Sequence, residues 1–184
     1  APDVEVEDRH RKPRAVPEHR VGEARGDAFA ARLTVEVGGR DADVEKYRAR
    51  VRDTGLADRV HLLGPRPLNR LAYYLDQGDI LVSPRLRGVN TPMKIYSYLL
   101  AGRAIVATRI ESHTQVLDDT CARLVDPQPA ALGSALRALA ADPAARAALG
   151  AAAADRARTR HSRAAYRAAL LGAYAQLSRG VPPD

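Results

Sequence analysis

DILVSPRLRGVNTPMKIYSYLLAGRAIVAT, residues 79–108, is the stretch that decides the fold of this chain. Residues 80–82 and 105–107 are short runs of apolar side chains, and polar residues, proline or glycine lie on either side of each run. Runs of this kind are typical of strands that are buried on both faces of a parallel sheet. The stretch therefore predicts two parallel strands joined by a loop and a helix.

The connecting helix carries the first sign of a binding site. Thr91 is a good N-cap, Pro92 suits the first helical position and Gly102 ends the helix. Lys94 falls in the first turn, where unpaired backbone N–H groups carry roughly +0.5 of a charge and an ammonium group is unfavourable by about 0.3 to 1 kcal/mol. A bound anion would reverse that sign, so Lys94 and the amides of residues 88–91 form a candidate phosphate site at the carboxyl end of a strand. A lysine that bends into solvent fits the same pattern, and both interpretations stay open.

The charge of the chain does not predict a nucleic-acid partner. Lys and Arg exceed Asp and Glu by seven in 184 residues, but acidic residues are interspersed among most of the arginines. The chain has no Trp and one Phe, and it lacks the pattern of aromatic and basic residues with which a sheet binds RNA. We therefore expect no nucleic acid among its partners.

The sequence predicts a cytoplasmic location. The chain has one cysteine, Cys121, which excludes an internal disulfide and fits a reducing compartment. No apolar run approaches 18 residues, and the N-terminal residues lack the apolar core of a signal peptide. Peripheral contact with the inner face of a membrane stays open, although a solvated face is the commoner role of a basic run such as Arg156, Arg158, Arg160 and Arg163.

The order of the elements predicts an α/β fold, a Rossmann-like, doubly wound parallel sheet followed by C-terminal helices. Residues 1–28 are rich in Arg, Glu, Asp and Pro and are predicted to be a tail, whereas residues 29–180 form the domain. Helical patterns alternate with strands predicted at 32–37, 60–63, 80–82, 105–107 and 122–125. Parallel sheets bind ligands beyond the carboxyl ends of their strands, so the candidate loops are residues 38–39, 64–67 and 83–91.

The C-terminal part of the chain is rich in alanine and predicts packed helices. A helix is expected to restart at Asp142 and Pro143, and Ser162 is expected to cap the final one. The final helix has an apolar stripe, which predicts a buried face made of Tyr166, Leu170, Tyr174 and Leu177.

Residues 59–127 resemble the C-terminal, donor-binding domain of GT-B-fold glycosyltransferases of the family 4 type, or group 1. The most specific match is PMKIYSYLLAG at residues 92–102 with the strands on either side of it, and weaker matches are residues 60–64 and 124–127. The resemblance implies a domain that binds a nucleotide diphosphate sugar of the UDP or GDP type. It also implies transfer of the glycosyl group to an acceptor, without a metal or other cofactor.

The resemblance implies roles for individual residues. Lys94 would be the catalytic residue, through charge stabilisation of the leaving diphosphate. Family members usually carry two glutamates, but here Ser97 takes the place of the second, and Val89 or Arg87 that of the first. Val89 cannot accept a hydrogen bond from a sugar, so hexose recognition is expected to differ. The donor-binding residues would be Gly88, Val89, Asn90, Thr91, Ser97, Arg66 and His113, and a capping or surface role for His113 stays open.

The resemblance also implies that part of the enzyme lies outside this chain. The family's domain normally starts with one more strand, and an N-terminal acceptor-binding domain precedes it; neither is visible in residues 1–28. In the doubly wound order 3-2-1-4-5-6, that strand is central, between the strands at 32–37 and 79–83. Unpaired buried backbone groups cost about 1 to 3 kcal/mol each. We therefore expect residues 3–6 to insert there, rather than the two flanking strands to pair directly, and we expect the chain alone to transfer no sugar.

Two other functions are alternatives. A non-catalytic nucleotide-binding or interaction module would keep the ligand site without the reaction. A flavodoxin-like regulatory domain would require an acidic cluster at a strand end, which the SPR at residues 83–85 does not offer. No metal site is expected, because the five histidines are scattered without metal-ligand spacing.

Overall fold

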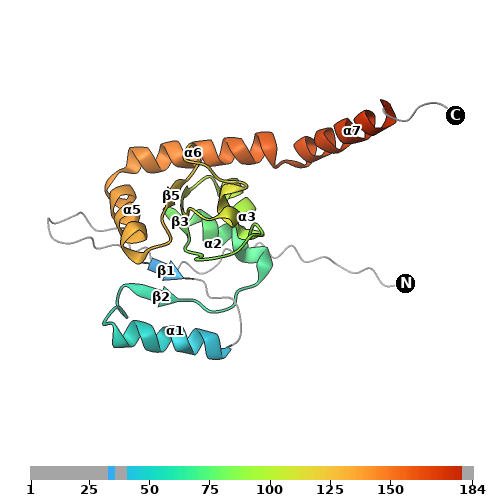
Figure 1. The fold of residues 1–184 in the computed structure, drawn as a ribbon. Coiled ribbons are helices and arrows are strands. Elements are labelled where there is room, and N and C mark those ends of the chain that lie inside the picture. The colour runs from blue at the N-terminus through green and yellow to red at the C-terminus, as the bar shows by residue number, and fades with distance from the viewer. Residues whose placement is uncertain (1–32, 36–40, 180–184) are drawn as a thin grey trace, which may run out of the picture. The chain divides into compact units, whose positions relative to one another are not determined.

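The chain alternates strands and helices. A computed structural model describes residues 33–35 and 41–179. The strands in this part of the chain pair in parallel (Figure 1), and they are β1 (Leu33–Val35), β2 (Val60–Leu62), β3 (Ile80–Ser83), β4 (Ala104–Thr108) and β5 (Arg123–Val125). The predicted α/β, Rossmann-like fold is confirmed. The predicted tail at 1–28 and the glycines at 38–39 lie outside the described residues.

The strands form two hydrogen-bonded groups. β1 pairs with β2, and β3, β4 and β5 form a sheet in that order with β4 in the centre. These neighbours are the ones that the doubly wound order predicts. Among the described residues, β1 and β3 do not pair, so direct closure of the predicted gap is not seen. The strand expected at residues 3–6 lies outside the described part and stays a prediction.

Helices connect the strands. The site helix, α3, is shorter than predicted, because it begins at Lys94 and not at Pro92, and Thr91 does not cap it. Its end is as predicted, since Gly102 adopts the left-handed conformation with a φ of 62°. The described helices are α1 (Asp41–Asp53), the 3₁₀ turn η1 (Leu68–Arg70), α2 (Leu71–Asp76), α3 (Lys94–Ala101), α4 (Glu111–Thr114), α5 (Pro129–Ala141), α6 (Pro143–Arg160) and α7 (Arg163–Arg179).

β4 is the centre of the core, and all five of its residues are buried. Alternate side chains of a strand point to opposite faces of the sheet. Ile105 and Ala107 belong to a cluster with residues of α3 and α6, whereas Ala104 and Val106 pack with residues of α5. The sheet is therefore covered on both faces, as the continuous apolar run of β4 predicts.

Small residues let α6 approach α3 closely. Gly150, Ala153 and Ala157 are the buried residues of α6. A Cβ added at Gly150 would lie 2.3 Å from the carbonyl oxygen of Gly102, the residue that ends α3. Only glycine fits this contact without a shift of one helix, so Gly150 fixes how α3 lies against α6.

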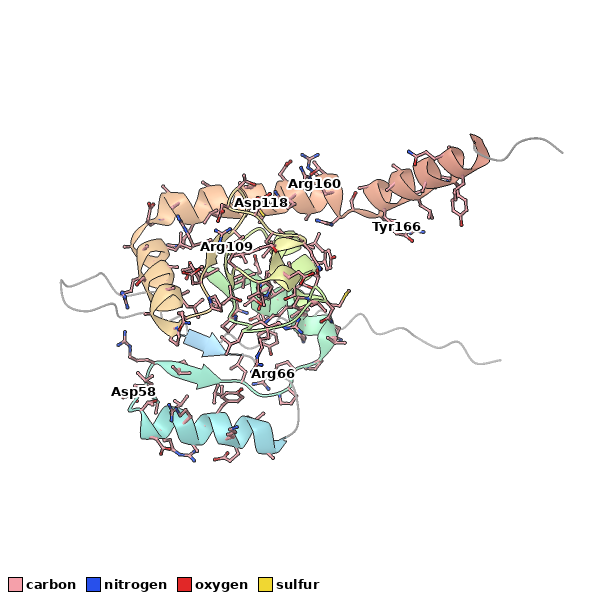
Figure 2. The ribbon with its side chains drawn as sticks, viewed as in Figure 1. Asp58, Arg66, Arg109, Asp118, Arg160 and Tyr166 are labelled. Carbon is pink, nitrogen blue, oxygen red and sulfur yellow. The ribbon has the colours of Figure 1, made fainter. Side chains whose placement is uncertain are left out.

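The prediction for α7 is wrong in one respect. The helix start at Asp142 and Pro143 and the cap at Ser162 are confirmed. Asp142 accepts a hydrogen bond from Ala145 N at 2.9 Å, and Ser162 accepts one from Ala165 N at 3.1 Å. The apolar stripe of α7 is exposed, however, because no described element covers it (Figure 2). The exposed residues are Tyr166, Leu170, Tyr174 and Leu177.

Candidate functional site

The candidate site is the loop that follows β3 and leads into α3, residues 84–93, here called the site loop. Side chains and backbone groups from three other segments hold its carbonyl oxygens. Thr108, at the end of β4, donates to the carbonyl of Arg85, and the backbone N–H of Ser112 donates to that of Gly88 at 3.3 Å. Gln115 Nε2 donates to the carbonyl of Val89 at 2.8 Å. The loop is thus fixed at the carboxyl ends of β3 and β4, where the predicted ligand site lies.

Three backbone N–H groups of the site loop lack a hydrogen-bond acceptor in the described part of the chain. Among the described residues, the backbone amides of Val89, Asn90 and Thr91 donate to no acceptor. Val89 and Asn90 are exposed, so a ligand can reach these amides. A loop whose carbonyls are occupied and whose N–H groups are free favours an anion.

Arg85 shapes the loop from within. Its guanidinium donates to the backbone carbonyl of Asn90 at 2.9 Å and to Asn90 Oδ1 at 3.2 Å. Gly88 has a φ of 142°, a value that side chains rarely allow, and a Cβ there would lie 2.5 Å from Arg85 Cζ. Gly88 is therefore required both by its backbone conformation and by the position of Arg85.

Lys94 and Arg85 place two positive charges at the site. Partial burial lowers the pKa of Lys94, and the charge of Arg85 lowers it further. The Lys94 ammonium lies 5.9 Å from the centre of the Tyr98 ring, and Lys94 as a whole is still exposed to solvent. Within the described residues, no carboxylate pairs with either cation. Two like charges without a carboxylate counter-ion make an electrostatic environment that favours an anion.

His113 lies under the strand ends and not at the surface. It is fully buried, and its Nδ1 lies 2.7 Å from the carbonyl oxygen of Thr108, which can only accept. Nδ1 therefore carries the proton, and Nε2 accepts from Ser83 Oγ at 2.9 Å. Burial lowers the pKa of His113, and the charges of Lys94 and Arg85 lower it too. The neutral ring thus ties the ends of β3 and β4 together, and both of its nitrogens are occupied.

The structure brings most of the predicted site residues together. Gly88, Asn90, Thr91 and Lys94 lie on the site loop or at the start of α3. Ser97 is three residues after Lys94, on the same side of α3, and is half-buried. Arg66 is exposed on the segment between β2 and η1 and makes no hydrogen bond or ion pair with the site loop among the described residues (Figure 2).

Sequence reasoning missed Arg85 and Gln115 as site residues. One signal was available for Arg85, because the residues between Asp79 and Glu111 include four arginines and Lys94 but no Asp or Glu. No comparable signal marks Gln115. It meets the loop 24 and 26 residues away in sequence, and no local pattern predicts such a contact.

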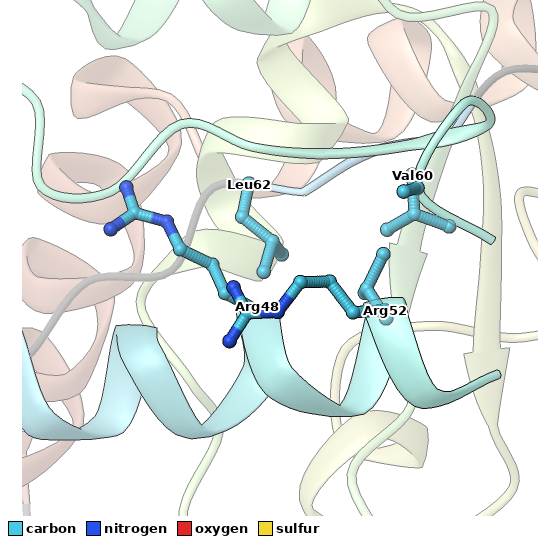
Figure 3. A pocket seen from close by; sticks show the side chains of 6 residues that line it. Arg48, Arg52, Val60 and Leu62 are labelled. Atoms are coloured by element: carbon cyan, nitrogen blue, oxygen red, sulfur yellow. The ribbon is translucent and has the colours of Figure 1, made fainter. Parts of the chain in front are cut away.

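A hollow lies away from the site loop, and none of the predicted site residues lines it. It has a volume of about 170 Å³ between α1 and β2 (Figure 3). Arg52, on its wall, already pairs with Glu45 at 3.0 Å. The lining residues are Arg48, Val51, Arg52, Ala57, Val60 and Leu62. In the described part of the chain, no three His, Cys, Asp or Glu side chains gather as they would around a metal ion.

The fold is similar to those of solved glycosyltransferases. Sucrose-phosphate synthase from Thermosynechococcus elongatus matches with a TM-score of 0.69 and 23% identity, over 82% of this chain and 39% of that protein. Anabaena HepE in complex with UDP matches with a TM-score of 0.69 and 16% identity, over 79% of this chain and 41% of that one. The C-terminal domain of LpcC, a group 1 family protein from Francisella tularensis, matches with a TM-score of 0.58 and 20% identity, over 67% and 65% of the two chains.

At these identities, the structural likeness concerns the fold alone. This chain spans about two fifths of the length of the first two proteins. A search of the curated proteins found no match. The sequence itself, however, matches the family described as "Glycosyl transferases group 1" over residues 14–142, which is more than half of the chain. The resemblance inferred from residues 59–127 is thereby confirmed: the chain belongs to the group 1 glycosyltransferases.

Proposed function

We propose that the site loop binds the diphosphate of a nucleotide diphosphate sugar of the UDP or GDP type. One observation carries the proposal: two cations without a carboxylate partner in the described residues, Arg85 and Lys94, lie beside a loop with open N–H groups. A diphosphate supplies the charge and the acceptor oxygens that this arrangement lacks. HepE, which shares the fold, has been solved in complex with UDP.

Lys94 would act on the leaving group. In the transfer, the bond between the sugar's anomeric carbon and the phosphate oxygen breaks as an acceptor oxygen bonds to that carbon. Negative charge then develops on the departing phosphate. Lys94, the start of α3 and the free amides of Asn90 and Thr91 would stabilise this charge.

The remaining predicted residues would serve the other parts of the donor. Ser97 would bond a hydroxyl group of the ribose, and Arg66 would approach the base or the phosphates. Val89 is 67% exposed on the site loop, so it would meet the sugar with an apolar surface. The acceptor would bind to a separate domain, as the resemblance to the family implies. His113 would support the loop from below through its bonds to Ser83 and Thr108.

Lys94→Ala tests the phosphate site. Hydrogen bonds to charged groups are worth about 1.5 to 3 kcal/mol, so the variant is expected to bind UDP or GDP about 10- to 150-fold more weakly. Calorimetry with the purified chain measures this. Lys46→Ala is the matched control, because Lys46 is exposed on α1. Equal affinity of Lys94→Ala and the parent would remove Lys94 from the site.

A peripheral contact with anionic lipid is a separate part of the proposal. α7 contains no acidic residue, and its apolar stripe is exposed. No helix in the described ranges is long and apolar enough to cross a membrane. Arg156 and Arg158 are already held by Asp118 and Asp155. The lipid contact would therefore rest on α7 and not on the whole basic run.

A further inference from the structure

Gln115 holds the site loop at two points. It follows α4, the short helix after β4. Its Nε2 donates to the carbonyl of Val89 at 2.8 Å, and its Oε1 accepts from Thr91 Oγ1 at 2.8 Å. Asn90 lies between these two residues and is held by Arg85. The side-chain amide of Gln115 therefore spans the three residues whose N–H groups are open.

The bond from Thr91 changes how α3 begins. A threonine before a helix normally turns its hydroxyl back to accept from an N–H of the first turn. Here the hydroxyl of Thr91 donates to Gln115 instead, and no side chain caps α3. Gln115 thus keeps the Thr91 hydroxyl from the N–H groups of Met93 and Lys94, which donate to no acceptor among the described residues.

The helix that precedes Gln115, α4, is held in place by burial and by hydrogen bonds. Ser112 and His113, which lie three and two residues before Gln115, are fully buried. The backbone N–H of Ser112 donates to the carbonyl of Gly88, and His113 is bonded to the ends of β3 and β4. Because α4 is tied to both strands, the amide of Gln115 is presented to the loop from a fixed position.

We infer that Gln115 is a positioning residue for the diphosphate: it holds the carbonyl of Val89 and the hydroxyl of Thr91 so that the N–H groups of Val89, Asn90 and Thr91 face the ligand. The inference rests on the proposed function for its ligand. Its structural part, the order that Gln115 imposes on the loop, is independent of any ligand.

The experiment uses Gln115→Leu in the 184-residue chain, with amide NMR spectra and calorimetry. Leucine keeps a similar volume at this exposed position but can neither donate nor accept. Thr114→Val is the matched control, because the neighbouring Thr114 hydroxyl donates to the carbonyls of Ile110 and Glu111 and to no site-loop residue that the structure describes. We expect the amide signals of Val89, Asn90 and Thr91 to move or broaden in Gln115→Leu and to stay in place in Thr114→Val.

The affinity for UDP should fall roughly tenfold in Gln115→Leu, since two loop hydrogen bonds are lost, while the thermal midpoint stays within about 2 °C of the parent. Thr91→Val should weaken binding in the parent background and have little further effect in Gln115→Leu, because both changes remove the same bond. Unchanged loop signals, or additive effects of the two substitutions, would overturn the inference. A parent chain that binds neither UDP nor GDP would overturn the proposed function, and the loop signals would then decide the role of Gln115 alone.

Discussion

Substitution of Gly150 by alanine tests the packing that carries the site helix. The added methyl group would lie 2.3 Å from the carbonyl oxygen of Gly102, and a backbone carbonyl cannot turn aside as a side chain can. The overlap must be relieved by a shift of α6 against α3. Overpacking of this kind costs about 1 to 3 kcal/mol.

The control is the same substitution at Gly133, in α5. A methyl group there meets its nearest atom, Arg137 Nη1, at 3.6 Å, which is an ordinary contact. Both positions lie inside helices, so both gain up to about 1 kcal/mol from the higher helix propensity of alanine. The difference between the two variants therefore isolates the overlap at Gly150.

Urea unfolding followed by circular dichroism measures the difference. We expect Gly150→Ala to be less stable than Gly133→Ala by about 1 to 3 kcal/mol, or roughly 2 to 12 °C in thermal midpoint for a chain of this size. The dependence on urea should be the same in both, since the surface exposed on unfolding does not change. If the two variants were equally stable, α3 and α6 would not approach as closely as described.

Two further predictions concern His113 and α7. Burial lowers the pKa of His113, so the imidazole ring binds a proton more readily in the unfolded chain than in the folded one. The free energy of unfolding should therefore decrease as the pH falls below about 6.5. The variant His113→Gln should lose this part of the pH dependence, whereas the control variant His61→Gln should keep it. For α7, the double variant Leu170→Ser and Leu177→Ser should pellet less with phosphatidylserine vesicles than the parent chain does, because both leucines are exposed on the apolar stripe. Phosphatidylcholine vesicles serve as the comparison. Equal pelleting of the variant and the parent chain would remove α7 as the contact.

The central unit was predictable because its signals are local. β3 and β4 are short apolar runs, and Gly102 ends α3 in the conformation that glycine favours. The start of α3 was not predictable from the same rules. Thr91 is a good cap by type, but Gln115, 24 residues later, binds its hydroxyl. The Thr91 hydroxyl thus bonds to a side chain distant in sequence and not to an N–H group at the start of α3.

The site residues also divide into those that local sequence signals predict and those that depend on long-range contacts. The role proposed for Lys94 rests on its place at a helix start, whereas His113 is buried by contacts that span 30 residues to Ser83. The apolar stripe of α7 shows which face of the helix could be covered, but a pattern within one helix does not identify what covers it. Contacts between residues far apart in sequence account for the first difference, and the lack of such contacts over the stripe of α7 among the described residues accounts for the second.

The division of the strands into two groups affects how the chain can open without unfolding completely. β1 and β2 share three residue pairs and no described pairing with β3, β4 or β5. β4, in contrast, is fully buried and is paired on both sides. The pairing of β1 with β2 can break without any change in the sheet of β3, β4 and β5. Amide hydrogens of β1 and β2 can therefore exchange with solvent through a small local opening. Those of β4 exchange only when the sheet beneath the site loop comes apart, and the loop therefore keeps its shape through the smaller and more frequent event.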